Sequence, residues 1–177
     1  IRIPNFANTK LFKNQNKKDA RISIGGLTAN DKILVNTGRI CYGKDQVLLT
    51  RAFVYLNKVL KFDSKLVIIG DGDSEVINAI NSILEKEKMK EKVILTGKLN
   101  RAEINLWLNA SDLFVFTSMA EGYPISLAEA ANCGLPIVST EITGVHDLVK
   151  NNQSGYLIEN RNSKSIAEAI IKAYKNK

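Results

Sequence analysis

The chain has 177 residues, of which 45% are hydrophobic and 24% are charged, and this globular composition excludes a mainly disordered protein. At roughly 150 residues per domain the length favours one sizeable core, and no apolar run approaches the ~18 residues that a membrane span needs. The first residues do not resemble a signal peptide, so we expect a soluble protein in the cytoplasm, including the inner face of the membrane.

Positive charge is concentrated near the start of the chain. The formal net charge is +7, and residues 1–32 contain seven basic and two acidic residues. Such a stretch suits phosphates or an anionic membrane surface, although a solvated lysine-rich segment has the same composition. Nucleic acid is not an expected partner, because no aromatic pattern accompanies the bases. Cys41 and Cys133 lack any zinc-binding spacing, so we predict reduced packing residues and no metal site.

From residue 33 onward, short apolar runs alternate with longer segments of helical period. The apolar runs predict strands at 33–35, 66–69, 93–96, 113–116, 136–139 and 156–158. The periodic segments predict helices at 44–60, 74–88, 100–110, 124–133 and 163–174. This alternation indicates an α/β fold with a doubly wound, mostly parallel, Rossmann-like sheet. Residues 5–31 show no period, so we assign 1–31 to an interdomain linker and 32–177 to the domain.

Several helix ends have local signals. Asn100 with Glu103 forms a capping-box pattern, Ser74 can cap the helix at 74–88, and Pro124 suits the first turn of a helix that Gly134 ends. The helix at 44–60 is expected to turn one apolar face inward, made of Val47, Leu48, Ala52, Phe53, Leu56, Val59 and Leu60. The irregular basic stretch ahead of a complete α/β unit indicates a fragment of a longer protein.

The loop after the first strand nearly matches a phosphate-binding P-loop. Gly38 to Lys44 has the required glycine spacing and lies between a strand and a helix. However, Asp45 stands where a Ser or Thr hydroxyl would bind magnesium, and a carboxylate there would repel phosphates. We therefore exclude a P-loop and retain Arg39 and Lys44 as two cations suited to a diphosphate, or as solvated side chains at a strand end.

A second glycine-rich turn, Gly70-Asp71-Gly72, follows the second strand. Glu75 occupies the position of the third glycine in a dinucleotide fingerprint, so a redox enzyme is not expected. A tight turn explains these glycines.

The strongest local signal is the segment from Glu121 to Glu129. Glu121 precedes the helix and Glu129 lies about 7 to 8 Å along its axis, so one acid would face the sheet edge and the other flank it. Free amides of the first turn, from Ile125 to Leu127, would favour an anion between them. Alternatively, Glu129 is an ordinary solvated helix acid and Glu121 is a charge that the helix dipole favours at the N-terminus.

Taken in order, these motifs resemble the C-terminal, donor-binding domain of retaining glycosyltransferases of the GT-B type, family 4 or glycosyl transferases group 1. The resemblance covers nearly the whole chain. The matching segments are Ile3-Pro4-Asn5-Phe6 with Leu11-Phe12, Gly38-Arg39-Ile40 with Lys44, Gly70-Asp71-Gly72, Gly97-Lys98-Leu99, Ser111-Asp112, Ser118 with Glu121 to Pro124, Glu121 to Glu129, Ala131 to Val138, and Thr143-Gly144-Val145 with Asp147.

The resemblance implies a nucleotide-diphosphate sugar as substrate, a UDP-sugar in preference to a GDP-sugar, with no cofactor and no metal. It assigns catalytic roles to Glu121, Arg39 and Lys44. Donor-binding roles fall to Gly38, Leu99, Gly122, Tyr123, Pro124, Ile125, Ser126, Leu127 and Glu129. Within these sets, Leu99 would touch the base, Glu121 the donor sugar and Glu129 the ribose.

The same resemblance implies retaining transfer to an acceptor in polysaccharide, glycolipid or lipid-linked oligosaccharide synthesis. The acceptor-binding N-terminal domain is absent from this sequence, so we expect the isolated chain to be inactive. His146 is expected to be a surface residue, Asp147 a structural one and Trp107 a packing one. Alternatives that remain are a GT-B-like sugar-nucleotide epimerase or phosphorylase, and a non-catalytic binding module.

Overall fold

The computed structural model describes residues 7–150 and 155–176, and within them six parallel strands form one sheet. The strands are β1 (Ile33–Thr37), β2 (Lys65–Ile69), β3 (Val93–Leu95), β4 (Leu113–Phe116), β5 (Ile137–Thr140) and β6 (Gly155–Ile158). Their order across the sheet is β3-β2-β1-β4-β5-β6, with every neighbouring pair parallel. The chain order reverses beside β1, so the expected α/β doubly wound fold class is confirmed.

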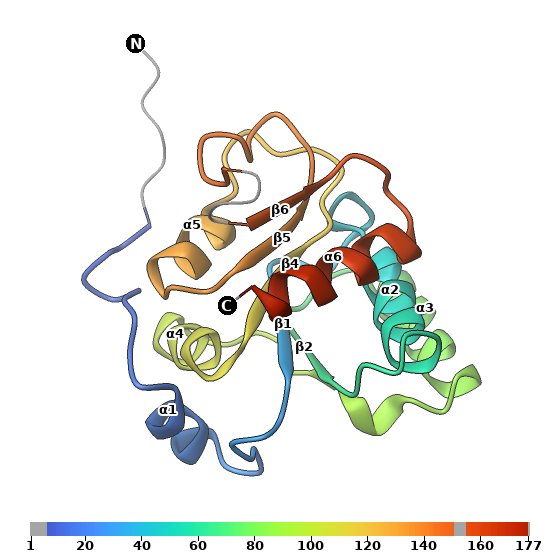
Figure 1. Cartoon of the computed structure of the whole chain (residues 1–177), viewed down its shortest axis with the longest axis horizontal. Helices are drawn as coiled ribbons and strands as arrows, with labels where there is room; N and C mark the ends of the chain where they lie inside the picture. Colours follow the sequence, from blue (N-terminus) through green and yellow to red (C-terminus); the bar gives the residue numbers. More distant parts are fainter. Residues whose placement is uncertain (1–6, 151–154, 177) are drawn as a thin grey trace.

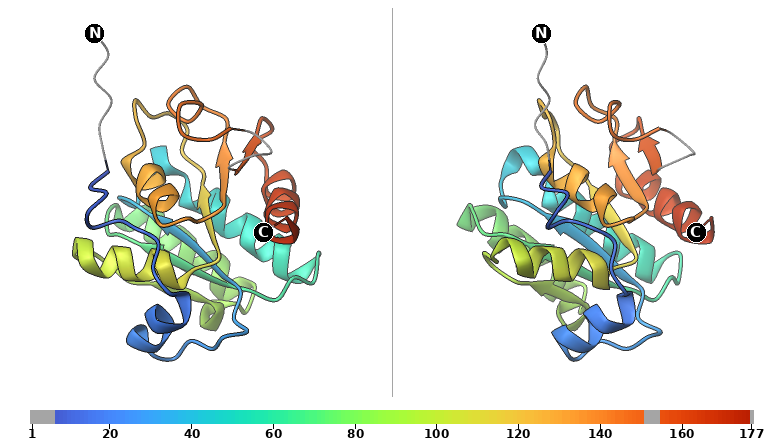
Figure 2. Two further views of the ribbon diagram at one scale, coloured as in Figure 1. Left: turned by 60° about the vertical axis from the view of Figure 1, so that its left-hand side comes forward. Right: turned by 90° about the vertical axis from the view of Figure 1, so that its left-hand side faces the viewer.

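Helices cover both faces of this sheet, as Figures 1 and 2 show. The α-helices are α1 (Lys17–Ile24), α2 (Gln46–Lys58), α3 (Ser74–Lys86), α4 (Arg101–Ala110), α5 (Ile125–Asn132) and α6 (Ser163–Lys175), with two short 3-10 helices, η1 (Tyr42–Lys44) and η2 (Lys90–Lys92). Helices α2, α3 and α6 pack on one face, and α4 and α5 on the other.

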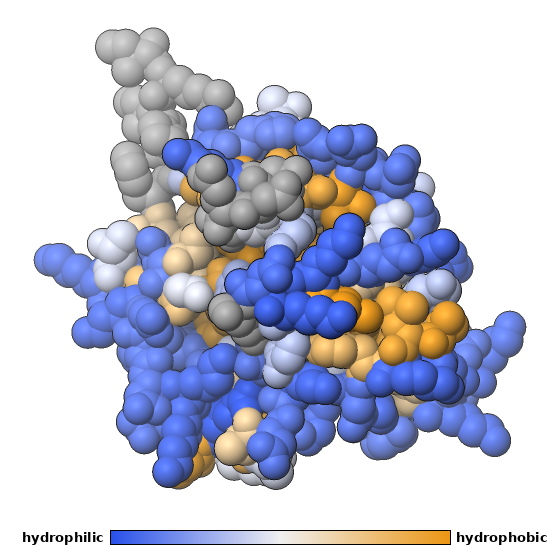
Figure 3. Space-filling view, viewed as in Figure 1, coloured by the Kyte–Doolittle hydropathy of each residue, from blue (hydrophilic) through white to orange (hydrophobic). Residues whose placement is uncertain are grey.

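Burial on both faces explains why the strands are continuous apolar runs. Leu34 points toward α2, α3 and α6, whereas its neighbour Val35 points toward α4 and α5, and both are fully buried. Each such side chain contributes about 1.5–3 kcal/mol by leaving water. Figure 3 shows that one outer face of the molecule is largely hydrophilic, with an apolar patch over α2.

The expected helix at 44–60 is shorter in the structure. Lys44 ends η1, Asp45 has a left-handed backbone with φ 51°, and α2 starts at Gln46. Val59 lies past the end of α2 with 56% of its surface exposed, so its predicted inward position is wrong, while Leu49 is fully buried. The helix ends at Lys58, so the predicted apolar face does not extend to Val59.

The segment 5–31 was expected to be irregular, and this is wrong for residues 17–24, which form α1. The side chain of Asn16 caps the helix by accepting from the backbone N–H groups of Lys18 and Asp19. The inward residues are Ala20 and Arg21, so the helix has no apolar stripe that a sequence could reveal. The resemblance to an interdomain motif at Ile3 to Phe6 lies outside the described residues.

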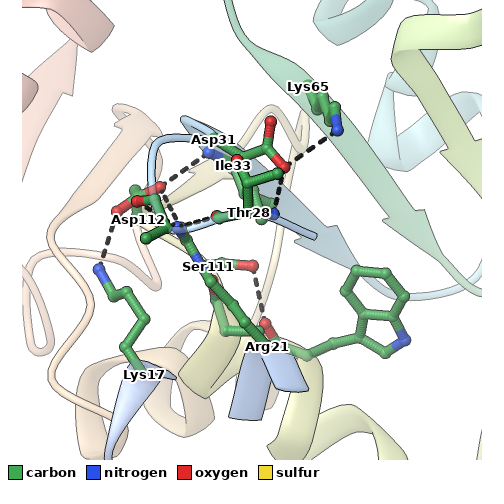
Figure 4. A network of polar contacts seen from close by, with 11 residues as sticks. Lys17, Arg21, Thr28, Asp31, Ile33, Lys65, Ser111 and Asp112 are labelled. Atoms are coloured by element: carbon green, nitrogen blue, oxygen red, sulfur yellow. Dashed lines mark hydrogen bonds and ion pairs between the residues drawn. The ribbon is translucent and has the colours of Figure 1, made fainter. Parts of the chain in front are cut away.

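Arg21 anchors α1 at the amino ends of the strands, as Figure 4 shows. It is 5% exposed and donates to the carbonyls of Ala110, Thr28 and Ala29 and to Asp112 Oδ2, all at 2.8–2.9 Å. Asp112 also accepts from Lys17 Nζ and from the N–H of Ile33, each at 2.8 Å. The network ties α1, β1 and β4 together.

Helix ends largely follow the predicted chemistry. Asn100 and Glu103 form the complete capping box of α4, and Gly134 has φ 75° just past α5. Pro124 is the N-cap of α5 rather than its first residue. Ser74 is the first residue of α3 and Asp73 the N-cap, so the predicted capping role of Ser74 is wrong. Within the described part of the chain, the helices are too short or too polar to cross a membrane.

Candidate functional site

The carboxyl ends of β1 and β2 approach each other very closely because of two glycines. A Cβ atom at Gly70 would lie 1.9 Å from the carbonyl oxygen of Gly38, and one at Gly72 would lie 2.0 Å from that of Ile40. The N–H of Gly38 donates to Ile69 O and the N–H of Ile40 to Asp71 O, each at 3.0 Å. Instead of the predicted tight turn, Gly70 and Gly72 form isolated β-bridges with Gly97 and Ile40, and the bridge to Ile40 holds the loop after β1 in place.

Gln46 fixes the loop that carries Arg39. Its side chain is fully buried, with Nε2 donating to Arg39 O at 3.0 Å and Oε1 accepting from the N–H of Cys41 at 3.3 Å. The next part of the loop is held by Thr117, whose hydroxyl lies 3.0 Å from Lys44 O and 3.1 Å from Asp45 O. These contacts set where the side chains of Arg39 and Lys44 can reach.

Asp45, the residue that excluded a P-loop, has a structural role at this edge. Its carboxylate caps α2 by accepting from the N–H of Leu48 and forms an ion pair of 2.7 Å with Arg161. Arg161 also donates to Thr117 O at 3.2 Å. Asp45 is therefore held by a helix end and a cation, which agrees with the exclusion.

Lys44 and Glu121 form an ion pair across the carboxyl ends of β1 and β4. The lysine side chain is 24% exposed and the glutamate 18%, so both groups remain within reach of a ligand. Two backbone contacts support the arrangement: the N–H of Met119 donates to Gly43 O at 2.8 Å, and Gly144 lets its loop approach the carbonyl of Glu121. The predicted convergence of these two charges is thus found.

Arg39 lies on the other side of the same loop, beside a pocket of about 270 Å³. The pocket is also lined by Gly38, Leu99 and Ile104, which brings together residues that follow β1 and β3. Gly38 joins this pocket to Lys44, because a Cβ atom there would lie 3.8 Å from Lys44 Cε. The Arg39 side chain is 72% exposed and forms an ion pair of 2.8 Å with Asp73, a partner that the sequence did not indicate.

Helix α5 starts beside Glu121, at Ile125, with Pro124 as N-cap. The amide of Leu127 was predicted to face the site, and this is wrong: it donates to Pro124 O at 3.1 Å, and the side chain is buried. The amides of Ile125 and Ser126 precede this first helical bond and are the ones suited to an anion. Gly122 is exposed, and Tyr123 is half-buried.

Glu129 is buried rather than solvated, with 7% of its side chain exposed. Arg101 Nη2 at the start of α4 donates to Glu129 Oε1 at 2.7 Å. Burial raises the pKa of the Glu129 carboxyl, and the charge and hydrogen bond of Arg101 oppose that rise. The ordinary solvated-acid alternative is therefore excluded for Glu129.

Two buried hydroxyls lie below this edge. Thr37 Oγ1 at the end of β1 and Ser118 Oγ just after β4 have no hydrogen-bond partner within the described residues, although their residues are 4% and 1% exposed. Unpaired polar atoms in such places are uncommon and cost stability unless water or a ligand reaches them. Both sit next to loops of the candidate site.

The structure also places the residues for which no binding role was expected. His146 is about half exposed and 3.4 Å from Glu141, in agreement with a surface position. Trp107 packs against the core on the α4 face. Cys41 and Cys133 are free, and burial raises the pKa of the Cys133 thiol to about 12. Residues 7–150 and 155–176 contain no cluster of three His, Cys, Asp or Glu side chains able to hold a metal ion.

Known proteins resemble this chain in sequence and in fold. Residues 17–177 match the family model described as glycosyl transferases group 1. The chain is 33% identical over 179 residues to the UDP-Gal:alpha-D-GlcNAc-diphosphoundecaprenol alpha-1,3-galactosyltransferase of Escherichia coli, covering 99% of this chain and 45% of that protein. It is 30% identical over 161 residues to the N-acetylgalactosamine-N,N'-diacetylbacillosaminyl-diphospho-undecaprenol 4-alpha-N-acetylgalactosaminyltransferase of Campylobacter jejuni, covering 85% and 42%. The chain thus spans less than half the length of these curated relatives.

Solved structures agree on the fold. Sucrose-phosphate synthase from Thermosynechococcus elongatus superposes with a TM-score of 0.88 and 22% identity, covering 98% of this chain and 43% of that one. The Anabaena protein HepE, solved in complex with UDP-glucose, superposes with a TM-score of 0.84 and 21% identity. The match covers 97% of this chain and 47% of HepE. At these identities the likeness shows a common fold.

Proposed function

The chain belongs to the glycosyl transferases group 1 family, and from this membership we propose that it is the C-terminal, donor-binding domain of a retaining glycosyltransferase of the GT-B type. The donor would be a nucleotide-diphosphate sugar held at the carboxyl ends of β1 and β4. The single observation that carries this proposal is the ion pair of Lys44 and Glu121, which places a cation and an acid at the mouth of one site beside the start of α5.

The diphosphate would occupy the positive part of this edge. Lys44, Arg39 and the amides of Ile125 and Ser126 offer charged and neutral donors within neighbouring loops. A diphosphate near Lys44 would compete with Glu121 for the ammonium group and free the carboxylate to accept from hydroxyls of the donor sugar. Glu121 would thereby bind the sugar only when the diphosphate is in place.

The nucleoside would extend toward β3. The pocket beside Gly38 and Leu99 has apolar walls suited to one face of a base, and Glu129 would accept from the ribose hydroxyls. Apolar contacts do not select a base strongly. We propose a UDP-sugar because the name of the Escherichia coli relative contains UDP-Gal, and because HepE, which has this fold, was solved in complex with UDP-glucose.

The proposed reaction breaks the bond between the sugar anomeric carbon and the diphosphate oxygen and forms one from that carbon to the oxygen of an acceptor hydroxyl, on the same face. The proton of that hydroxyl would pass to the departing diphosphate. Negative charge grows on the departing diphosphate as the first bond breaks. Lys44 and Arg39 would stabilise that charge most strongly in the transition state, where one well-placed donor is worth about 3 kcal/mol. No cofactor is proposed.

The acceptor would be bound by a further domain, which we propose for the longer protein because the curated relatives are more than twice as long as the part they share with this chain. Both relatives cited above name a diphosphoundecaprenol-linked sugar. We therefore propose transfer to a lipid-linked glycan at the cytoplasmic face of a membrane. Fractionation of cells would find the longer protein with membranes, and release by high salt would indicate peripheral association.

Isothermal calorimetry on the 177-residue chain tests the binding role. UDP should bind, and Lys44→Met should weaken it by about tenfold or more, because a charge-assisted contact is lost. Lys92→Met is the matched control: it removes an exposed ion pair with Asp63 near the opposite end of the sheet and should leave UDP affinity unchanged. If the folded chain binds none of UDP, GDP and ADP, the proposal is wrong.

Product analysis tests the chemical role. The protein that contains this chain should transfer sugar from the donor to an acceptor, and proton NMR of the product should show the anomeric configuration of the donor. Inversion would contradict the retaining assignment. Release of an epimerised sugar without any acceptor would indicate an epimerase instead.

A further inference from the structure

We propose that Arg101 is a positioning residue for nucleotide recognition, acting on the ribose through Glu129. The inference rests on the proposed function and extends it to a residue that touches no reacting atom. Arg101 opens α4, two residues after Leu99 of the base pocket, and Glu129 lies on α5, so their ion pair joins the two helices on this face of the sheet.

The geometry of the pair leaves one carboxylate oxygen for a ligand. Arg101 Nη2 donates to Glu129 Oε1 at 2.7 Å, and within the described residues the structure gives Oε2 no partner. A guanidinium on Oε1 restricts rotation of the carboxylate and so the directions of the lone pairs on Oε2. The ribose hydroxyls would donate to this oriented oxygen.

Arg101 is itself held from two sides. The capping box of Asn100 and Glu103 fixes the backbone at the start of α4. The guanidinium carbon lies 4.9 Å from the ring centroid of Phe12, which is 1% exposed and whose N–H donates to Asn8 O at 2.8 Å. Although 55% of the Arg101 side chain is exposed, its charged end thus has a defined place.

Charge gives Arg101 a second effect on Glu129. Burial raises the pKa of this carboxyl, and Arg101 is the cation that opposes the rise. Among the described residues, the Cys133 thiol also interacts with Glu129, and it is neutral because burial raises its pKa to about 12. Without Arg101, a larger fraction of Glu129 would carry a proton and lose acceptor strength toward the ribose.

A merely structural ion pair would behave differently. It would link α4 to α5 and contribute to stability, but its loss would weaken binding of every nucleotide by the same factor. Action through Glu129 instead predicts that the loss depends on the hydroxyls of the ribose, and this difference can be measured.

The test compares UDP with 2′,3′-dideoxy-UDP by calorimetry on the chain and three variants. Arg101→Met should weaken UDP by about tenfold, because Glu129 loses a charge-assisted hydrogen bond, and dideoxy-UDP by less than about twofold. Arg101→Lys should recover most of the UDP affinity. Arg51→Met, which changes an exposed arginine on α2, is the matched control and should bind both ligands like the original chain.

The pH dependence gives an independent readout. Carbon NMR of the Glu129 carboxyl should show a higher pKa in Arg101→Met than in the original chain, and the UDP deficit of the variant should shrink as pH rises. Equal weakening of both ligands, or an unchanged Glu129 pKa, would overturn the inference. Failure of the original chain to bind any nucleotide would instead overturn the proposed function, and the ribose role with it.

Discussion

The two ends of the sheet use the same kinds of charged side chain in opposite ways. At the amino ends of the strands, Asp112 is 7% exposed and accepts from Arg21, Lys17 and a backbone N–H, so the charges saturate one another (Figure 4). At the carboxyl ends, Lys44 with Glu121 and Arg39 with Asp73 form separate pairs that solvent reaches. Saturation suits stability, whereas donors and acceptors that can exchange partners suit ligand binding.

Removal of Asp112 should have the largest effect, and it should fall on stability. In Asp112→Ala, Arg21 becomes a buried cation without its carboxylate, which typically costs about 3–5 kcal/mol. Urea unfolding measures the loss. Lys17→Met, which removes a more exposed partner of the same carboxylate, should cost about 1 kcal/mol or less. If Asp112→Ala remained stable but bound UDP more weakly, the assignment of stability to the amino ends and of ligand binding to the carboxyl ends would be wrong.

Replacement of Glu121 should affect catalysis rather than folding. In the proposed longer protein, Glu121→Gln should reduce transfer by about a hundredfold, since the charged contact that we propose to the donor sugar would be lost. Urea unfolding of the chain should change by about 1 kcal/mol or less. Steady-state transfer rates check the first expectation. Glu85→Gln, an exposed acid on α3, is the control, and equal activity losses in both variants would contradict the role of Glu121.

Gly70 tests whether the carboxyl ends also depend on backbone packing. Gly70→Ala places a methyl group on the carbonyl of Gly38 and should cost about 1–3 kcal/mol while displacing the loop of Arg39 and Lys44. UDP affinity should fall together with stability, as calorimetry and urea unfolding would show. Gly43→Ala, where a Cβ atom meets nothing within 4 Å, should change neither quantity. Normal affinity in Gly70→Ala would mean that the close approach is unimportant for the site.

The smallest expected effect is on the pH dependence of stability, to which two acids contribute in opposite directions. At the amino ends, burial raises the pKa of Asp31, but hydrogen bonds from the Thr28 N–H and Lys65 outweigh it and lower the pKa below 3.8. The contribution of Asp31 to the free energy of unfolding is therefore present above that value and is lost as pH falls. The pKa of Glu129 is raised above 4.5. Its contribution to the free energy of unfolding is therefore present below that value and is lost as pH rises through the pKa of the folded state.

Urea unfolding across pH would separate these contributions. Asp31→Asn should flatten the fall in stability below about pH 4, and Glu129→Gln should flatten the decline that begins above about pH 4.5. Asp63→Asn should act in the same direction as Asp31→Asn, because Asp63 lies near Asp31 at the amino ends of the strands and its hydrogen bond from Lys92 also lowers its pKa. A Glu129→Gln effect confined to acid pH would contradict the raised pKa.

The sheet and most helices could be predicted from the sequence because each is encoded locally. Strand β4 was predicted at the residues where it occurs, since Leu113 to Phe116 is apolar throughout, and the capping box at Asn100 lies within four residues. Helix α1 was missed because its stability comes from a capping side chain and from Arg21, whose carboxylate partner is 91 residues away. A buried arginine leaves no periodic signal.

The candidate site could be predicted only in part for the same reason. The rule that ligands bind at the carboxyl ends of parallel strands placed Arg39, Lys44 and Glu121 at one edge. The partners Asp73, Arg101 and Arg161 were missed, because the pairs they form join residues 28 to 116 positions apart. The sequence also could not show that the N–H of Leu127 donates to Pro124 O, because this hydrogen bond depends on where the helix starts.

The packing of residues 8–16 sets a limit on domain exchange between relatives. The backbone of Gln15 and Lys13 hydrogen-bonds to the side chain of Asn109, and the ring of Phe12 packs against the guanidinium of Arg101. This stretch therefore packs as part of the folded domain although it precedes α1. A chimaera joined immediately before α1 would lack the contacts of residues 8–16 with α4, including the contact of Phe12 with Arg101. A transplanted domain with a junction no later than Ala7 would keep the proposed nucleotide subsite intact.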